Sequence, residues 1–174
     1  MLAGLNIRLI ITTMQLPAHQ YLDKLNIPYE KAEFLPTIDK GAASVAHALG
    51  YQERQMIKTL IFELDTTERI LVMVGGDQNI VSGLLKKAVG SRNIRMASFD
   101  AVRETTGYVV GSIPPFSWQP VGFRTFLDGS LMDETVLGVG TGVWGHEILI
   151  TPNNLVEASG AVLVNLTQRE NPVL

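Results

Sequence analysis

The chain has 174 residues, enough for one domain that buries roughly 70% of its unfolded surface without disulfide support. It contains no cysteine, which excludes thiolate catalysis, zinc ribbons and iron–sulfur clusters, and its three histidines, His19, His47 and His146, lack metal-ligand spacing. The net charge of −3 argues against a protein that coats nucleic acid by bulk electrostatics. We therefore expect neither a metal ion nor another cofactor.

The N-terminal segment lacks the features of a targeting signal. Residues 1–8 have no basic stretch, and the short apolar patch after them is not followed by a small-residue cleavage site. No window approaches the apolar length of a membrane span. We expect a soluble, cytoplasmic protein without a membrane partner, divided into an N-terminal extension (1–16), one domain (17–166) and a C-terminal tail (167–174).

Hydrophobic spacing and turn residues predict short helices and strands in mixed order. In chain order we expect a helix over 17–26, a strand over 29–34, a helix over 42–49, a hairpin of strands over 56–64 and 69–74, a helix over 80–89, a short strand over 94–96, a helix from Ser98 to near Gly107, strands over 123–127, 136–139 and 147–150, a helix starting at Thr151-Pro152 and a last strand over 161–166. Gly50 should end the second helix, and Asp77 should cap the third. Hairpins without a repeating β–α period indicate a single α+β, or mixed α/β, domain.

Lys58 stands in the otherwise apolar run 56–62, which is typical of a buried strand. A buried ammonium needs a partner, because an isolated buried ion is costly. That partner could be a carboxylate, solvent reached by the long side chain, or an anionic ligand. A lysine on an edge strand, where a charge blocks aggregation, is the purely structural alternative.

Two irregular segments stand out. Residues 108–120 contain Gly111 and the adjacent Pro114 and Pro115, which fix an extended backbone that can present carbonyls and amides to a ligand, or form a mere surface turn. Residues 138–146 are rich in glycine. They match neither a phosphate-binding loop nor a dinucleotide fingerprint, because a strand rather than a helix follows.

Basic residues gather between positions 86 and 103, where Asp100 is the only acid. They are Lys86, Lys87, Arg92, Arg95 and Arg103. This pattern predicts either a local basic patch on an acidic body or a solvated helix face.

Taken in order, these segments resemble the YbaK and prolyl-tRNA-synthetase-associated editing domains. The matching segments are 21–29, 42–50, 56–62, 106–116, 126–128 and the glycine-rich stretch through 146–148. The resemblance covers nearly all of residues 17–166. It implies a mixed, mostly antiparallel, barrel-like sheet flanked by short helices. It also implies an aminoacyl-tRNA deacylase that serves translation fidelity. Such an enzyme hydrolyses the ester of mischarged tRNA, in particular Ala- or Cys-tRNA(Pro).

The resemblance also implies the residues of the site. Lys58 matches the pocket lysine, and Gly111 with Pro115 matches the Gly-x-x-x-Pro loop, whose backbone would hold the aminoacyl group and the attacking water. The substrate-binding positions implied are Ser112, Pro115, Asp128, Gly140, Gly142 and His146. The chain departs from the family where Ser112 and Ser117 replace frequent glycines, and Ser112 would add a hydroxyl to the pocket rim.

The residues restrict the mechanism. No serine–histidine–acid order and no obvious general base is present, so the family's substrate-assisted route fits, in which a ribose hydroxyl of the terminal adenosine positions or activates water. A pocket separates amino acids that differ by one methylene by only about 1–3 kcal/mol. Recognition of the tRNA would then come from Lys86, Lys87, Arg92 and Arg95, or from a partner such as prolyl-tRNA synthetase or another translation factor.

Two other functions remain open. The same pocket could bind an aminoacyl-adenosine or tRNA end without hydrolysing it, as a catalytically silent interaction module. The replacement of a frequent glycine by Ser112 is the feature that supports this alternative. A plain scaffold subunit would leave Lys58 and the two shaped loops unexplained.

Overall fold

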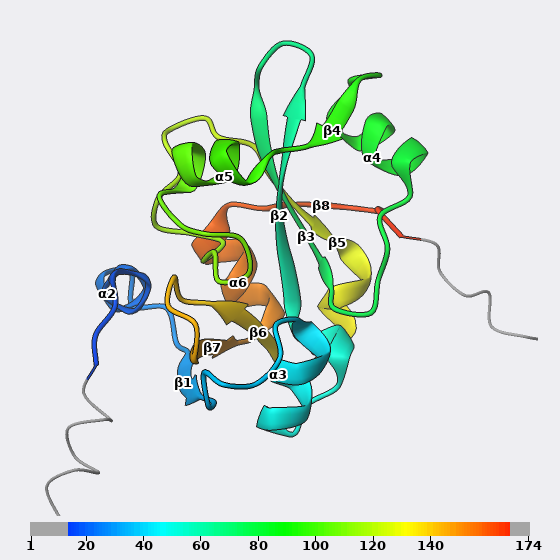
Figure 1. Cartoon of the computed structure of the whole chain (residues 1–174). Coiled ribbons are helices and arrows are strands. Elements are labelled where there is room, and N and C mark those ends of the chain that lie inside the picture. The colour runs from blue at the N-terminus through cyan, green and yellow to red at the C-terminus, as the bar shows by residue number, and fades with distance from the viewer. Residues whose placement is uncertain (1–13, 168–174) are drawn as a thin grey trace, which may run out of the picture.

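The computed structural model describes residues 14–167 (Figure 1). The helices are α2 (Pro17–Lys24), α3 (Ala42–Leu49), α4 (Ser82–Val89), α5 (Phe99–Thr106) and α6 (Pro152–Ser159), with the 3₁₀ helices η1 (Glu53–Gln55) and η2 (Gly129–Asp133). The strands are β1 (Glu30–Glu33), β2 (Ile57–Leu64), β3 (Arg69–Gly75), β4 (Ile94–Met96), β5 (Thr125–Asp128), β6 (Leu137–Gly140), β7 (His146–Ile150) and β8 (Val162–Val164). The predicted order of elements is therefore present.

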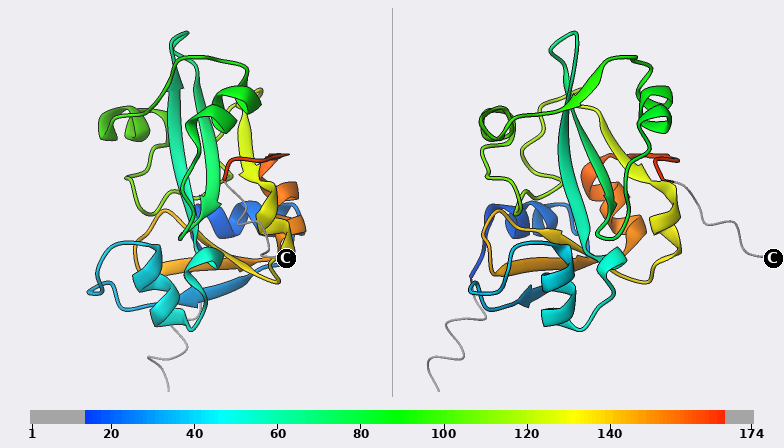
Figure 2. Two further views of the ribbon diagram at one scale, coloured as in Figure 1. Left: turned by 90° about the vertical axis from the view of Figure 1, so that its right-hand side faces the viewer. Right: turned by 45° about the vertical axis from the view of Figure 1, so that its right-hand side comes forward.

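The strands form two sheets. One has the order β1-β7-β6 and is antiparallel throughout. The other has the order β4-β2-β3-β5-β8, antiparallel across β4, β2 and β3 and parallel from β3 to β8. The three-stranded sheet lies across the lower end of the long β2–β3 hairpin (Figures 1 and 2). The predicted α+β class is confirmed, and the sheet is divided into these two parts.

Within residues 14–167, one isolated bridge joins the two sheets. Met56, just before β2, pairs in parallel with Gly138 of β6. A Cβ on Gly138 would lie 2.6 Å from the sulfur of Met56, so a larger residue there would require the Met56 side chain to move. The bridge thereby sets β6 beside the start of β2, where Lys58 stands.

Alternating side chains divide the core between the two faces of the five-stranded sheet. Ile61 of β2 packs with residues of β6, β7, α2 and α6 in the largest apolar cluster. Leu60, Phe62 and Leu64 point the other way and pack against Leu85 and other residues of α4. Because Lys58 shares the parity of this second set, it leaves β2 on the face that α4 covers.

Helix ends follow their sequence signals with one exception. Ser98 and Thr151 accept hydrogen bonds from backbone amides as N-caps, and Gly50 ends α3 in a left-handed conformation. The prediction that Asp77 caps the helix after β3 is wrong, because α4 begins at Ser82. Asp77 forms instead an ion pair with Arg54 at 3.1 Å.

No helix within residues 14–167 combines the length and the apolar character needed to cross a membrane.

Candidate active site

Lys58 is half-buried on β2, opposite Val74 of β3. Its ammonium donates a hydrogen bond to the backbone carbonyl of Gln78, in the turn after β3. This partner differs from each one that the sequence suggested. β2 lies between β4 and β3, but among the described residues β4 pairs only with residues 62–64, so Lys58 has a strand neighbour on the β3 side alone, as on an edge strand. An ammonium has three N–H donors, so two remain for an anionic ligand or water.

The side chain of Gln78 extends this contact. It is buried, accepts a hydrogen bond from the amide of Gly75 at 2.8 Å and donates one to Oγ of Ser130 at 2.9 Å. Ser130 in turn donates to Oδ1 of Asp128. A continuous chain of polar contacts thus runs from Lys58 through Gln78 and Ser130 to Asp128. Sequence reasoning missed Gln78, since a single glutamine carries no motif.

Asp128 is 1% exposed and accepts hydrogen bonds from four donors. Oδ1 receives the amide of Ser130 at 3.0 Å and its hydroxyl. Oδ2 receives the amide of Leu166 at 2.8 Å and the hydroxyl of Thr167 at 3.2 Å. The carboxylate therefore caps η2 and fixes the segment after β8, and within the described residues its oxygens are committed to these donors.

The two irregular segments pack directly on each other. A Cβ on Gly140 would lie 2.7 Å from the carbonyl oxygen of Ser112, and the amide of Gly142 donates to that same oxygen at 2.7 Å. Gly142 has a φ of +96°, and the ring of Tyr108 lies where its Cβ would be, at 2.4 Å. Ser112 is itself buried rather than standing on an open rim. The glycine-rich stretch and the Gly-x-x-x-Pro loop are thus in direct contact.

Side-chain hydrogen bonds fix the proline end of the Gly-x-x-x-Pro loop, whereas its glycine end is exposed. Pro114 and Pro115 are buried, and their carbonyls accept hydrogen bonds from the side chains of Trp118 and Gln119 at 2.6 and 2.7 Å. Gly111 is exposed at a φ of +102°, with open space where a Cβ would stand. The amides of residues 110–112 donate to no acceptor within the described residues. An amide without an intramolecular acceptor remains available to water or to a ligand.

His146 begins β7 at the other side of the glycine-rich stretch. Its Nδ1 lies 3.6 Å from Oε1 of Glu33 on β1, and its carbonyl accepts a hydrogen bond from Thr141. The ring is half-buried. His146 thus stands apart from the Lys58–Asp128 chain.

Glu147, the next residue, was not singled out by sequence reasoning. It is buried, one oxygen lies 3.4 Å from the position of a Cβ on Gly138, and it has no hydrogen-bond or ion-pair partner within the described residues. Burial raises the pKa of this carboxyl to about 8. The sequence signal that could have identified Glu147 is a glutamate at the start of the otherwise apolar predicted strand 147–150.

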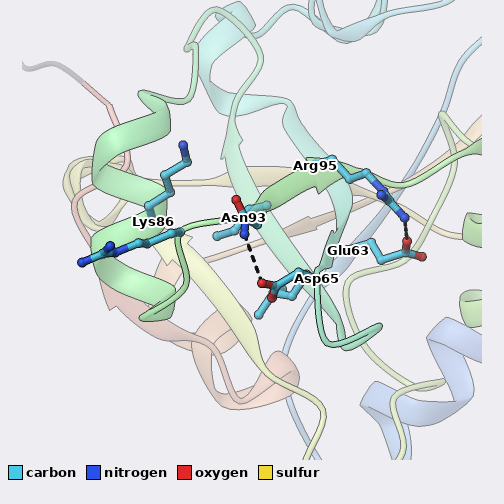
Figure 3. A pocket seen from close by; sticks show the side chains of 8 residues that line it. Glu63, Asp65, Lys86, Asn93 and Arg95 are labelled. Carbon is cyan, nitrogen blue, oxygen red and sulfur yellow. Dashed lines mark hydrogen bonds and ion pairs between the residues drawn. The ribbon is translucent and has the colours of Figure 1, made fainter.

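Three of the four predicted tRNA-binding residues gather at the far end of β2. Lys86, Arg92 and Arg95 line a cleft of about 230 Å³ between α4 and β4, and Lys87 does not line it (Figure 3). The remaining walls are formed by Glu63, Leu64, Asp65, Asn93 and Ile94. This cleft is separate from the Lys58 region.

Comparison with known proteins decides the family. Residues 39–158 match the family model described as the aminoacyl-tRNA editing domain. The chain belongs to this family. The match spans α3 to α6 and includes Lys58, Gly111, Asp128 and His146, and the predicted class of enzyme, an aminoacyl-tRNA deacylase, is confirmed.

Relatives of the editing domain occur as a chain of similar length and within longer enzymes. A candidate Cys-tRNA(Pro)/Cys-tRNA(Cys) deacylase, EbsC of Enterococcus faecalis, is 25% identical over 160 residues, which cover 91% of this chain and 97% of that protein. The proline–tRNA ligase of Staphylococcus aureus (strain Newman) is 31% identical over 122 residues, 70% of this chain but 21% of the ligase.

Solved structures share the fold. A hypothetical protein has a TM-score of 0.79 at 25% identity, covering 87% of this chain and 99% of its own. A candidate trans-editing enzyme for prolyl-tRNA synthetase has a TM-score of 0.77 at 23% identity, covering 90% and 100%. Both match the editing domain almost end to end.

Proposed function

We propose that this editing domain hydrolyses the ester bond of Ala- or Cys-tRNA(Pro) in trans, with Lys58 and Gly111 of the Gly-x-x-x-Pro loop as its catalytic residues. The observation that carries the proposal is the position of Lys58. Lys58 is half-buried and its ammonium binds a neutral carbonyl, and no carboxylate among residues 14–167 forms an ion pair with it. Such a site favours an anion. The terminal nucleotide of tRNA supplies one in its phosphate.

The proposed reaction needs no side-chain nucleophile. Water attacks the ester carbonyl carbon, the carbonyl oxygen becomes an oxyanion, and the bond to the ribose oxygen breaks, leaving a free amino acid and a ribose hydroxyl. The neighbouring ribose hydroxyl positions the water, and the unpaired amides around Gly111 stabilise the oxyanion. Lys58 anchors the phosphate and does not take a proton.

The remaining predicted residues have supporting parts in this proposal. Ser112 and Pro115 fix the loop, while Gly140 and Gly142 form the floor against which it packs. His146 screens the amino acid. Asp128 acts as a positioning residue through Ser130 and Gln78, since its own oxygens already bind four donors. Lys86, Lys87, Arg92 and Arg95 contact the body of the tRNA, with prolyl-tRNA synthetase as a partner that delivers it.

The names of the relatives support the choice of substrate. EbsC is named for Cys-tRNA(Pro) and Cys-tRNA(Cys), and the other curated relative described above is a proline–tRNA ligase. Because a small pocket separates alanine, serine and cysteine poorly, we expect more than one small amino acid to be removed.

The test is a panel of esters on one tRNA. The purified protein is incubated with tRNA(Pro) charged separately with alanine, cysteine, serine and proline, and the loss of each ester is followed against a no-protein control. Rapid loss of alanine or cysteine, with proline spared, is the expected result. No loss of any ester from a folded protein that still binds the charged tRNA would overturn the proposal and identify a silent binding module.

A further inference from the structure

The cleft between α4 and β4 is lined by three cations, of which Arg95 is in an ion pair. Among residues 14–167, no ion pair joins Lys86 or Arg92 to another side chain. Arg95 pairs with Glu63, and Asn93 donates to Asp65 at 3.1 Å (Figure 3). The close-up shows Arg95 and Glu63 meeting on one side of the cleft and Lys86 standing on the other.

Glu63 has a second partner. Its other oxygen lies 3.2 Å from Nε of Arg69, whose guanidinium also binds Glu104 at 2.9 Å and Thr105 at 2.9 Å. Hydrogen bonds from Arg95 and then Arg69 lower the pKa of Glu63, so it carries a full charge at neutral pH. The Arg95 side chain is 77% exposed, whereas that of Arg69 is 25% exposed. Arg95 can therefore leave while Glu63 stays paired with Arg69.

We infer that this cleft binds a phosphate group of the tRNA acceptor strand, with Glu63 holding Arg95 in place until that phosphate replaces it. Lys86, Arg92 and Arg95 then contact one phosphate at the edge of the sheet, and Glu63 keeps its ion pair with Arg69, which Glu104 shares. Arginine suits this exchange, because its planar fork binds carboxylate and phosphate in the same geometry. The inference rests on the proposed function and adds a second contact point to it.

The position of the cleft fits one strand that reaches both sites. Glu63 lies five positions after Lys58 on β2, which is about 17 Å at the usual rise of a strand. A stacked nucleic-acid strand advances roughly 3.4 Å per nucleotide, so the cleft lies about five nucleotides from an end anchored at Lys58. Lys58 and α4 lie on one face of the sheet, whereas Glu63 and its partner Arg95 point from the opposite face at the edge strand β4, so the bound strand would pass this edge. The cleft would therefore contact the acceptor stem just beyond the single-stranded end when that end is anchored at Lys58.

The first test measures binding of uncharged tRNA over a range of salt, which needs no hydrolysis. We expect Lys86→Ala and Arg95→Ala each to weaken binding by roughly tenfold and to lower the salt slope by about one. Lys87→Ala, one position along the same helix but outside the cleft, should have a smaller effect. Lys24→Ala, an exposed cation on α2, is the charge-matched control. Equal effects of all four variants would overturn the inference.

Glu63→Gln gives the more specific result. It removes the competing charge and keeps the shape of the side chain, so tRNA should bind several times more tightly than to the wild type. Glu157→Gln removes the same charge from an exposed position on α6 and serves as the control. Equal binding by these two variants, with unchanged unfolding curves, would contradict the role of Glu63.

Short substrates separate this inference from the proposed function. The cleft variants should hydrolyse a 3′-aminoacyl ester of adenosine monophosphate at the wild-type rate, because it is too short to reach the cleft, and should lose kcat/KM only on full-length tRNA. A wild type that binds tRNA through the cleft but hydrolyses nothing would refute the proposed function alone. Titration with inorganic phosphate distinguishes the source: phosphate binding that Lys86→Ala removes, without a parallel loss for tRNA, would overturn the tRNA assignment.

Discussion

Lys58 and Asp128 do not touch, yet they are the two ends of one hydrogen-bond chain. The ammonium of Lys58 binds the carbonyl of Gln78, whose side chain binds Ser130, whose hydroxyl binds Asp128. Asp128 also holds the backbone of Leu166, in the segment after the last strand. The position of the proposed catalytic lysine thus depends on residues that are distant in sequence and buried in the structure.

Gln78→Ala tests this chain in its middle. The change removes two side-chain hydrogen bonds, so the Gly75 amide loses its acceptor and Ser130 loses one donor while keeping its bond to Asp128, and we expect a loss of about 2 kcal/mol in the free energy of unfolding. Deacylation should fall further than the folded fraction does, because the acceptor of Lys58 is no longer fixed. Urea unfolding and single-turnover hydrolysis measure the two effects. An active, destabilised variant would show that Lys58 needs no such support.

Asp128→Asn tests whether the carboxylate of Asp128 stabilises the fold or contacts the substrate. An asparagine side chain turns one acceptor oxygen into a donor, which then faces groups that are themselves donors. We expect a loss of roughly 2–3 kcal/mol in the free energy of unfolding. Unchanged stability together with lost hydrolysis would contradict the position described for Asp128 and favour a direct contact with substrate.

Gly111 and Gly142 form a matched pair of positions with positive φ. Gly111→Ala meets open space, so only backbone strain on the order of 1 kcal/mol is expected, with a clear loss of hydrolysis. Gly142→Ala adds displacement of the Tyr108 ring and should cost at least about 2 kcal/mol. Thermal unfolding and hydrolysis assays on both variants check this. If Gly111→Ala hydrolyses at the wild-type rate, the loop amides have no catalytic part.

Glu147 predicts a pH dependence of stability. Burial raises its pKa from 4.5 to about 8, so between these values the folded chain keeps a proton that the unfolded chain has released. Stability should therefore fall as pH rises through this window, at most by about 1.4 kcal/mol per pH unit, and should be insensitive to this group below it. Glu147→Gln, which is neutral at every pH, should remove the fall.

The measurement for Glu147 is urea unfolding of both proteins at several pH values across the window. The two curves should converge near the acidic end and diverge toward the alkaline end, where Glu147→Gln is the more stable protein. Parallel curves would show that the buried carboxyl is not the titrating group.

Local signals in the sequence were sufficient for most elements. Ser98 and Thr151 precede helices and accept the cap hydrogen bonds expected of them, and Gly50 ends α3. Asp77 was the exception, because an ion pair with Arg54 competes for the carboxylate and a turn of four residues intervenes before α4. A sequence window does not contain that distant competitor.

Contacts between distant segments could not be predicted in the same way. The bridge from Met56 to Gly138 depends on which strands meet, and the carbonyl partner of Lys58 is a backbone group that every residue has. The basic segment was predicted from its charges, but the carboxylate of Glu63 on the neighbouring strand was not. Its pairing with Arg95 follows from the register of β2 with β4.

The most direct test of the account compares the wild type with Lys58→Ala in single-turnover hydrolysis of Ala-tRNA(Pro) and Cys-tRNA(Pro), with unfolding curves on the same samples. We predict rapid loss of at least one ester by the wild type and a rate lower by roughly a hundredfold in Lys58→Ala, which should still fold. A Lys58→Ala protein that is more stable and hydrolyses at the wild-type rate would contradict the account and leave Lys58 a structural residue.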